Sequence, residues 1–359
     1  MLIFPPKFTA IQLKQLARLC GESRSGTKPD ISNRIVDALN KFKPLAPRTR
    51  VLSIDLGIRN LAYTLLEVPK SSQAATAKSR KRQDATSVVP ILHAWERLGL
   101  IPEPSVKGRG KRKGKTGKVS AAPDTDQEAD PTNTPVPIED FSPVRLSGLA
   151  VDLILTRLLP LKPDLVIIEQ QRFRSMGGSS VLEWTLRVNS LESMLYAAFT
   201  ALQKLGRWPH GRLEGVAARK VLEFMALQEG EGASIWTKDA PGDNKRMKKD
   251  IVGRMLRDTM SGTNLRGVSV GEDEGLADVV REYVDRWSKY GKRGRSSPAT
   301  GSREGLKKLD DLADCLLQGI AFIRWQENKR LLLEGGVEAL EDQMVDEEAL
   351  KDQMVDEEA

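Results

Sequence analysis

The stretch VLSIDLGIRNLAYTLLE, residues 51–67, places a carboxylate, Asp55, inside an otherwise apolar run. Residues 51–56 and 61–67 predict two strands joined by a tight turn at GIRN, and strands connected in this way pair in antiparallel fashion. A carboxylate in a strand core loses its hydration, which costs on the order of several kcal/mol unless a cation or donor compensates. Asp55 is therefore a candidate functional residue.

The periodicity of the remaining chain predicts an α/β fold. Residues 88–100 predict a third strand, and PDLVIIEQQRFRS (163–175) predicts a short buried strand that ends in polar residues. RLEGVAARKVLEFM (212–225) reads as a strand turning into a helix. Helices are expected at 142–161, 180–205, 244–256 and 305–331. The order predicts a mixed sheet, three antiparallel strands and then parallel ones, flanked by helices.

Further carboxylates occupy positions that an apolar core would not favour. Glu169 ends the run LVIIE, and KKLDDLADCLLQGIAF supplies Asp310, Asp311 and Asp314 on the last helix. Acids three or four residues apart on a helix can project together, and like charges at that spacing repel. Hard oxygen ligands without histidine or thiolate indicate Mg²⁺ or Mn²⁺, and several converging carboxylates suit a pair of ions about 4 Å apart. Each acid alone could also be an ordinary ion-paired or solvated residue.

Composition excludes several other classes of protein. No apolar run reaches the roughly 18 residues of a membrane span. Cys20 and Cys315 lie far apart, which argues against a disulfide scaffold or a zinc site, and His93 and His210 leave little for histidine-based catalysis. The N-terminus has no acid before Glu22 but carries two prolines and little serine, so it indicates a mitochondrial presequence only weakly.

Charge is distributed very unevenly along the chain. The net charge is +7, but residues 334–359 contain eleven acids and one lysine, so residues 1–333 carry +17. This basic body suggests a polyanionic partner such as a nucleic acid, the alternative being a solubilising surface. Basic polar inserts are expected at about 69–87, 103–140 and 289–304, and the acidic tail repeats EALEDQMVDE (338–347) as EALKDQMVDE (348–357). We expect the tail to be disordered or a frayed helix.

Residues 8–42 predict two short helices. Through LKQLARLCGESRSGTKPDISNRIVDAL the segment resembles the SAP motif, a helix–loop–helix DNA-binding module. The alternative is a helical hairpin that packs on the main domain. We expect a SAP-like module at 1–46, a nuclease-like domain at 47–333 and the acidic tail at 334–359. By this resemblance the phosphate-contacting residues would be Lys14, Arg18, Lys28 and Arg34.

Together, the strand bearing Asp55, the motif VIIEQQR and KKLDDLAD on a last helix resemble the RuvC-like branch of the RNase H fold. More closely, they resemble the fungal mitochondrial Holliday-junction resolvases, which also carry an N-terminal SAP-like segment. The resemblance implies that Asp55, Glu169 and Asp314 are metal ligands, with Asp311 or Asp310 as the fourth. It also implies a homodimer that nicks four-way DNA junctions symmetrically, a mitochondrial location, and dimer surfaces near 145–160 and 181–202.

Polar residues beside these acids are candidates for DNA contact, because arginine can grip a phosphate with two donors and glutamine can reach base edges or the backbone. The DNA-binding candidates are Gln170, Gln171, Arg172, Arg174, Lys28, Arg34, Lys248 and Lys249.

Two other functions stay open. An actin/hexokinase-like ATPase also begins with a strand that carries Asp–x–Gly, but here the usual Thr and a second phosphate loop are missing. In a non-catalytic junction-binding protein, the acids would only form ion pairs.

Overall fold

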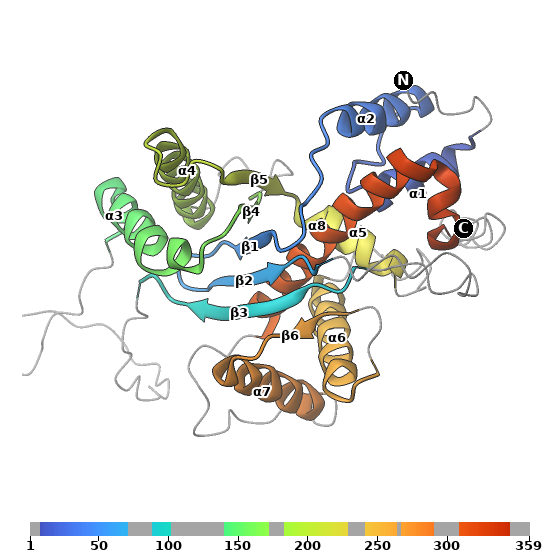
Figure 1. Cartoon of the computed structure of the whole chain (residues 1–359). Helices are drawn as coiled ribbons and strands as arrows, with labels where there is room; N and C mark the ends of the chain where they lie inside the picture. Colours follow the sequence, from blue (N-terminus) through green and yellow to red (C-terminus); the bar gives the residue numbers. More distant parts are fainter. Residues whose placement is uncertain are drawn as a thin grey trace, which may run out of the picture.

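The computed structural model describes residues 8–70, 88–101, 140–171, 183–228, 241–263, 267–290 and 309–344. A six-stranded sheet lies at its centre, with helices packed on both faces (Figure 1). Within these ranges no helix is long and apolar enough to cross a membrane.

The sheet has the predicted mixed, RNase H-like arrangement. The strands β1 (Arg50–Asp55), β2 (Leu61–Glu67) and β3 (Ile91–Leu98) are antiparallel neighbours. On the other side of β1, β4 (Leu165–Glu169) and β5 (Arg212–Val216) run parallel to it. The strand order is β5-β4-β1-β2-β3-β6, in which the two-residue β6 (Ser269–Val270) pairs in parallel with β3 and is not predicted by the sequence.

One face of the sheet is covered by α3 (Pro143–Leu153) and α4 (Glu183–Lys204), as Figure 1 shows. Leu52 and Ile54 of β1 point into this layer, because alternate residues of a strand face opposite sides. The helix predicted at 142–161 is confirmed in its first part. It then widens into a π-helical turn, η1 (Ile154–Leu158), and a 3₁₀ turn, η2 (Leu159–Leu161).

The opposite face is covered by a larger group of helices that surrounds α8 (Leu309–Gly335). It includes α5 (Ala218–Gln228), α6 (Pro241–Met260) and α7 (Glu274–Tyr290). α7 is not among the helices predicted from the sequence, although its residues Leu276, Val280 and Tyr283 form a buried stripe at helical spacing. Asp273 caps its start by accepting a hydrogen bond from the Leu276 N–H at 2.7 Å.

The N-terminal helices α1 (Ala10–Leu19) and α2 (Lys28–Asn40) share this core. Leu16 and Ile35 are fully buried in the same cluster as Trp325 of α8. At the end of α1, Gly21 has a φ of +70°, and a Cβ there would lie 2.4 Å from the Trp325 ring. The two predicted helices are therefore confirmed and pack directly on the main domain, while a SAP-like DNA-binding role stays a prediction.

The acidic tail begins differently from the expected frayed end. After α8, residues Val337–Gln343 form a 3₁₀ helix, η5, that folds back on α8. Leu340 is fully buried there, and the Gln343 side-chain amide donates to Asn328 Oδ1 at 3.1 Å. η5 packs on α8 because the acidic repeat at 338–347 contains this apolar residue, Leu340. Most of the three basic inserts and residues 345–359 lie outside the described residues.

Candidate active site

Two of the predicted acids end neighbouring parallel strands. Ile54 of β1 pairs with Ile168 of β4, so Asp55 and Glu169 leave the sheet at the same edge. The two carboxyl groups interact with each other, and a hydrogen bond between them raises the pKa of Asp55 and lowers that of Glu169. Apolar β-branched residues build both strands, and the acids stand where those strands end.

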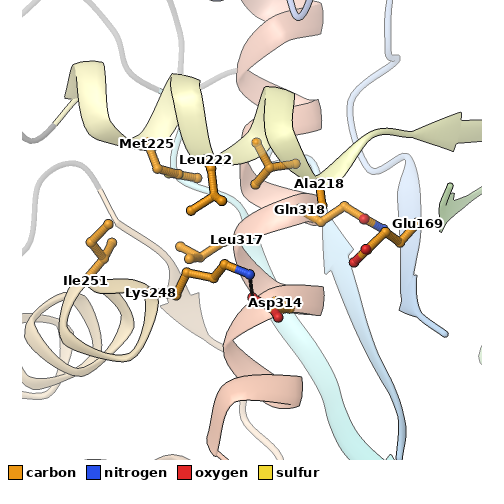
Figure 2. Close-up of a pocket in the computed structure, with 10 residues that line it drawn as sticks. Glu169, Ala218, Leu222, Met225, Lys248, Ile251, Asp314, Leu317 and Gln318 are labelled. Carbon is orange, nitrogen blue, oxygen red and sulfur yellow. Dashed lines mark ion pairs between the residues drawn. The ribbon is translucent and has the colours of Figure 1, made fainter. Parts of the chain in front are cut away.

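The third acid, Asp314, comes from the second turn of α8, whose position over the sheet is fixed by two close contacts. Gln318, one turn further along, is buried and donates to Ser53 Oγ at 3.1 Å and to the Ile54 carbonyl at 3.2 Å. Gly319 lets the helix approach the sheet, because a Cβ there would lie 2.7 Å from Leu66 Cδ1 and 3.2 Å from Ser53 Cβ. These contacts set Asp314 in the same pocket as Glu169 (Figure 2), and its charge acts on both Glu169 and Asp55.

Burial and mutual repulsion make the three acids difficult to ionise. Burial raises the pKa of Asp55 well above its usual range, and the charges of Glu169, Asp314 and Asp311 raise it further. The pKa of Glu169 is raised by burial and then by Asp314. Burial also raises the pKa of Asp314, although the nearby ammonium of Lys248 lowers it. A cation that joins such a cluster favours the ionised form of its carboxyl groups.

The acids of α8 are each paired with a basic side chain. Lys248 Nζ lies 2.6 Å from Asp314 Oδ1, Arg97 Nε lies 3.0 Å from Asp311 Oδ2, and Lys245 Nζ lies 2.9 Å from Asp310 Oδ2. Burial raises the pKa of Asp310, but the hydrogen bond and charge of Lys245 outweigh it and hold that pKa below its usual value. Asp311 is thus one of the charges acting on Asp55, whereas Asp310 is held toward α6.

The chemistry of this donor set fits a divalent metal ion. Asp55, Glu169 and Asp314 offer only oxygen atoms and each has a pKa raised by burial, and such carboxylates are the ligands that Mg²⁺ or Mn²⁺ prefers. In the part of the chain that the structure describes, no three acidic, histidine or cysteine side chains are already gathered closely enough to hold an ion. The Lys248–Asp314 ion pair occupies a carboxylate oxygen that a metal would need.

The glutamines after Glu169 are part of the frame around the site. The Gln170 N–H continues the sheet by donating to the Val216 carbonyl at 2.8 Å, and its side chain lies over Gly215. The Gln171 N–H donates to Glu192 Oε2 at 3.3 Å, and its side-chain amide reaches the Leu56 carbonyl at 3.5 Å. Arg172 and Arg174 lie outside the described residues.

The basic residues predicted to bind DNA have different surroundings. Lys28 is exposed at the start of α2, whereas Arg34 Nη1 donates to the carbonyls of Ser23 and Ser25 and so holds the loop between α1 and α2. Lys248 is part of the acid cluster, and the charge of Lys249 acts on Asp310. Lys14 and Arg18 are half-buried on α1.

Sequence reasoning misses three residues that shape the site. Gln318 interrupts an apolar stripe of α8, and this polar interruption was a usable signal. Arg97 bonds both Asp311 and Asn60 of the β1–β2 turn, but an arginine in a half-exposed strand gives no such indication. Glu192, whose pKa is raised by burial, supports Gln171 from α4.

A comparison with protein families identifies the chain. The family model described as "Mitochondrial resolvase Ydc2 / RNA splicing MRS1" matches residues 51–332. The chain belongs to this family. The match contains all five acids at the sheet edge and on α8, and every strand except the first residue of β1.

Individual members of the family extend this result. The chain is 27% identical over 315 residues to a Schizosaccharomyces pombe protein named "Cruciform cutting endonuclease 1, mitochondrial", a match that covers 88% of this chain and 91% of that protein. A Saccharomyces cerevisiae protein of the same name is 24% identical over 211 residues, covering 54% and 57% of the two chains. The solved structure described as "Crystal Structure of the Yeast Mitochondrial Holliday Junction Resolvase, Ydc2" has 24% identity and a TM-score of 0.49, with 92% and 98% covered.

The raised pKa of Asp55 predicts that Asp55→Asn stabilises the metal-free protein at neutral pH. An acid with a folded-state pKa above its unfolded value favours folding below the unfolded pKa of about 3.9, and this contribution is lost as pH rises through the folded pKa. Asparagine mimics the protonated acid. Urea denaturation in EDTA near neutral pH should therefore give a free energy of unfolding about 1–3 kcal/mol higher for the variant.

The difference should shrink as the pH approaches about 4, where both folded and unfolded carboxyls are largely protonated. Asp152→Asn, at an exposed position on α3, is the matched control and should change stability by less than about 0.5 kcal/mol. An Asp55→Asn protein that is less stable than the wild type in EDTA would contradict the electrostatic interpretation.

Proposed function

We propose that this protein is a divalent-metal-dependent endonuclease that resolves four-way DNA junctions in mitochondria. The observation that carries the proposal is the convergence of three half-buried acids, Asp55 and Glu169 from neighbouring strand ends and Asp314 from α8, whose charges act on one another. Such an arrangement is costly for a folded protein unless a cation compensates it. Membership in the family and the names of both relatives, which include the word mitochondrial, support the same activity and compartment.

The acids would hold Mg²⁺ or Mn²⁺, with two ions per active site. Bound there, the ions would supply an activated water and would stabilise the leaving 3′ oxygen of a phosphodiester. The charges of Glu169, Asp314 and Asp311 all act on Asp55, so its carboxylate is suited to both ions. We favour Asp311 over Asp310 as the fourth ligand, because the charge of Asp311 acts on Asp55 while Asp310 pairs with Lys245.

The basic surface of the body would hold the junction through its phosphates. A net charge of +17 over residues 1–333 favours a polyanion and makes binding depend on salt. Recognition by branch shape and phosphate position needs few contacts with base edges. Gln170 and the basic residues Lys28, Lys248 and Lys249 are the described candidates for these contacts, and Arg172 and Arg174 follow Glu169 directly in sequence.

The family description names RNA splicing beside junction resolution, and a splicing protein needs only to bind nucleic acid. Binding alone gives no reason to bury several carboxylates together, because acids repel a polyanion. The retention of Asp55, Glu169 and Asp314 as one cluster therefore favours the nuclease.

The assay that tests the nuclease uses labelled four-way and linear duplex DNA, with Mg²⁺ or with EDTA. Paired symmetric nicks are expected in the junction only, and only with metal. Asp55→Asn and Asp314→Asn should each lower the cleavage rate by at least about 100-fold while junction binding persists, and Asp278→Asn, at an exposed position on α7, is the control. Tight binding without cleavage in Mg²⁺ or Mn²⁺ would instead favour a binding protein, and ATP hydrolysis without nicking would favour the ATPase.

A two-fold symmetric junction calls for two active sites, and we infer that the exposed face formed by α3 and η1 makes the homodimer contact. Val144, Val151 and Leu155 are 83%, 43% and 51% exposed, and Gly148 lies among them in open space. The spacing of this stripe is symmetric about its centre. Two antiparallel copies would set position 144 opposite 155 and position 148 opposite 151, as a two-fold contact requires.

Placing a charge in the stripe should therefore separate the dimer. Val151→Asp is expected to convert a dimer to a monomer in sedimentation velocity, because the two-fold axis brings the new charges of both copies close together. The matched control is Leu205→Asp, at a 73% exposed position after α4. A protein that sediments as a monomer before mutation, or a Val151→Asp dimer as tight as the wild type, would contradict the contact.

A further inference from the structure

Lys248 has an unusual position for a residue expected to bind DNA. Its ammonium lies 2.6 Å from Asp314 Oδ1, and its side chain is only 16% exposed. Figure 2 shows the lysine reaching across from α6 toward Asp314, with Glu169 on the far side of the same pocket. The charge of Lys248 also acts on Glu169. The lysine therefore stands in the position of a cation for the acid cluster.

The rest of the molecule holds Lys248 in this place. Val252 and Leu256 of α6 are fully buried in the core shared with α8. Gly253 lies against the Trp287 ring of α7, where a Cβ would be 2.1 Å away, and the Trp287 indole donates to Asp250 at 2.7 Å. These contacts fix the rotation of α6, so that the lysine points at the acids.

Apolar residues around Lys248 strengthen its ion pair with Asp314. Leu222, Met225, Ile251 and Leu317 line the pocket around the lysine stem. Low polarity increases the attraction between an ammonium and a carboxylate, and equally the repulsion between an ammonium and a metal ion. An ammonium and a divalent cation therefore compete for the same Asp314 oxygen.

We propose that Lys248 is a displaceable counter-ion of the metal site, which leaves Asp314 when divalent metal binds and then contacts a phosphate of the bound DNA. The proposal rests on the proposed nuclease function and explains how Asp314 is kept paired before metal arrives. The lysine is already at the mouth of the acid cluster, where the phosphate to be cut must approach. Metal and DNA would both work against the Lys248–Asp314 pair, so each would favour the binding of the other.

Binding of Mn²⁺ to the DNA-free protein tests the exchange, measured from the electron paramagnetic resonance signal of unbound Mn²⁺. Lys248→Met removes the competing charge and keeps the stem, so the dissociation constant for Mn²⁺ should fall by about fivefold or more. Lys245→Met is the matched control. It removes the same charge from the same helix but frees Asp310, and it should shift the constant much less.

Junction cleavage tests the second half of the exchange. At saturating Mn²⁺ the KM of Lys248→Met for the junction should rise by about threefold or more, although its metal binding is tighter. In EDTA no metal displaces Lys248 from Asp314, so the lysine is not available to DNA. Lys248→Met and the wild-type protein should therefore bind the junction equally. Lys248→Arg should restore the KM, because it keeps the charge. A merely structural lysine would weaken metal and DNA binding together.

Unchanged or weaker Mn²⁺ binding by a folded Lys248→Met protein would overturn the exchange. If this variant does not fold, Lys248→Gln takes its place in the same measurement. An unchanged KM at saturating Mn²⁺ would overturn the contact with DNA. Failure of the proposed function is distinguishable, because then the wild-type protein itself would neither bind Mn²⁺ nor cut the junction.

Discussion

The crossing of α8 over β1 is the contact on which the site depends. Gln318 satisfies a buried strand carbonyl and Ser53, and Gly319 allows the helix backbone to lie close to the sheet. One turn earlier on the same helix is Asp314. The sheet supplies Asp55 and Glu169 by parallel pairing of β1 with β4, so two independent packing constraints converge on one small volume.

The acids that the proposed metal site needs lower the stability of the folded protein. Acids whose pKa values are raised by burial and by neighbouring charges lower the stability of a metal-free protein at neutral pH, and the fold accepts this cost at the half-buried end of two neighbouring strands. Basic residues from α6 and β3 reduce it, because Lys248 pairs with Asp314 and Arg97 with Asp311. Lys248 and Arg97 also determine how easily a metal ion binds, because they occupy carboxylate oxygens of the acids. Counter-ions are thus as much a part of the site as the acids.

Sequence alone predicts the main strands of the sheet and singles out acids that the structure brings near one another, because a carboxylate in an apolar strand or stripe contradicts its surroundings. Asp55, Glu169 and Asp314 stand out in this way, and the motifs around them indicate the family. The counter-cations do not stand out, since Lys248 and Arg97 are ordinary residues of a basic helix and a half-exposed strand. Their role appears only when elements far apart in sequence pack together. β6 is missed because two residues carry no periodic pattern, whereas α7 and the buried Leu340 had apolar signals that could have been used.

The most direct test of the central claim is a crystal structure with Mn²⁺, located by its anomalous scattering. The account predicts Mn²⁺ bound at about 2.1 Å by carboxylate oxygens of Asp55, Glu169 and Asp314 together, from both strands and the helix. Mn²⁺ bound to the acids of α8 alone, or elsewhere on the protein with Asp55 and Glu169 still bonded to each other, would contradict it.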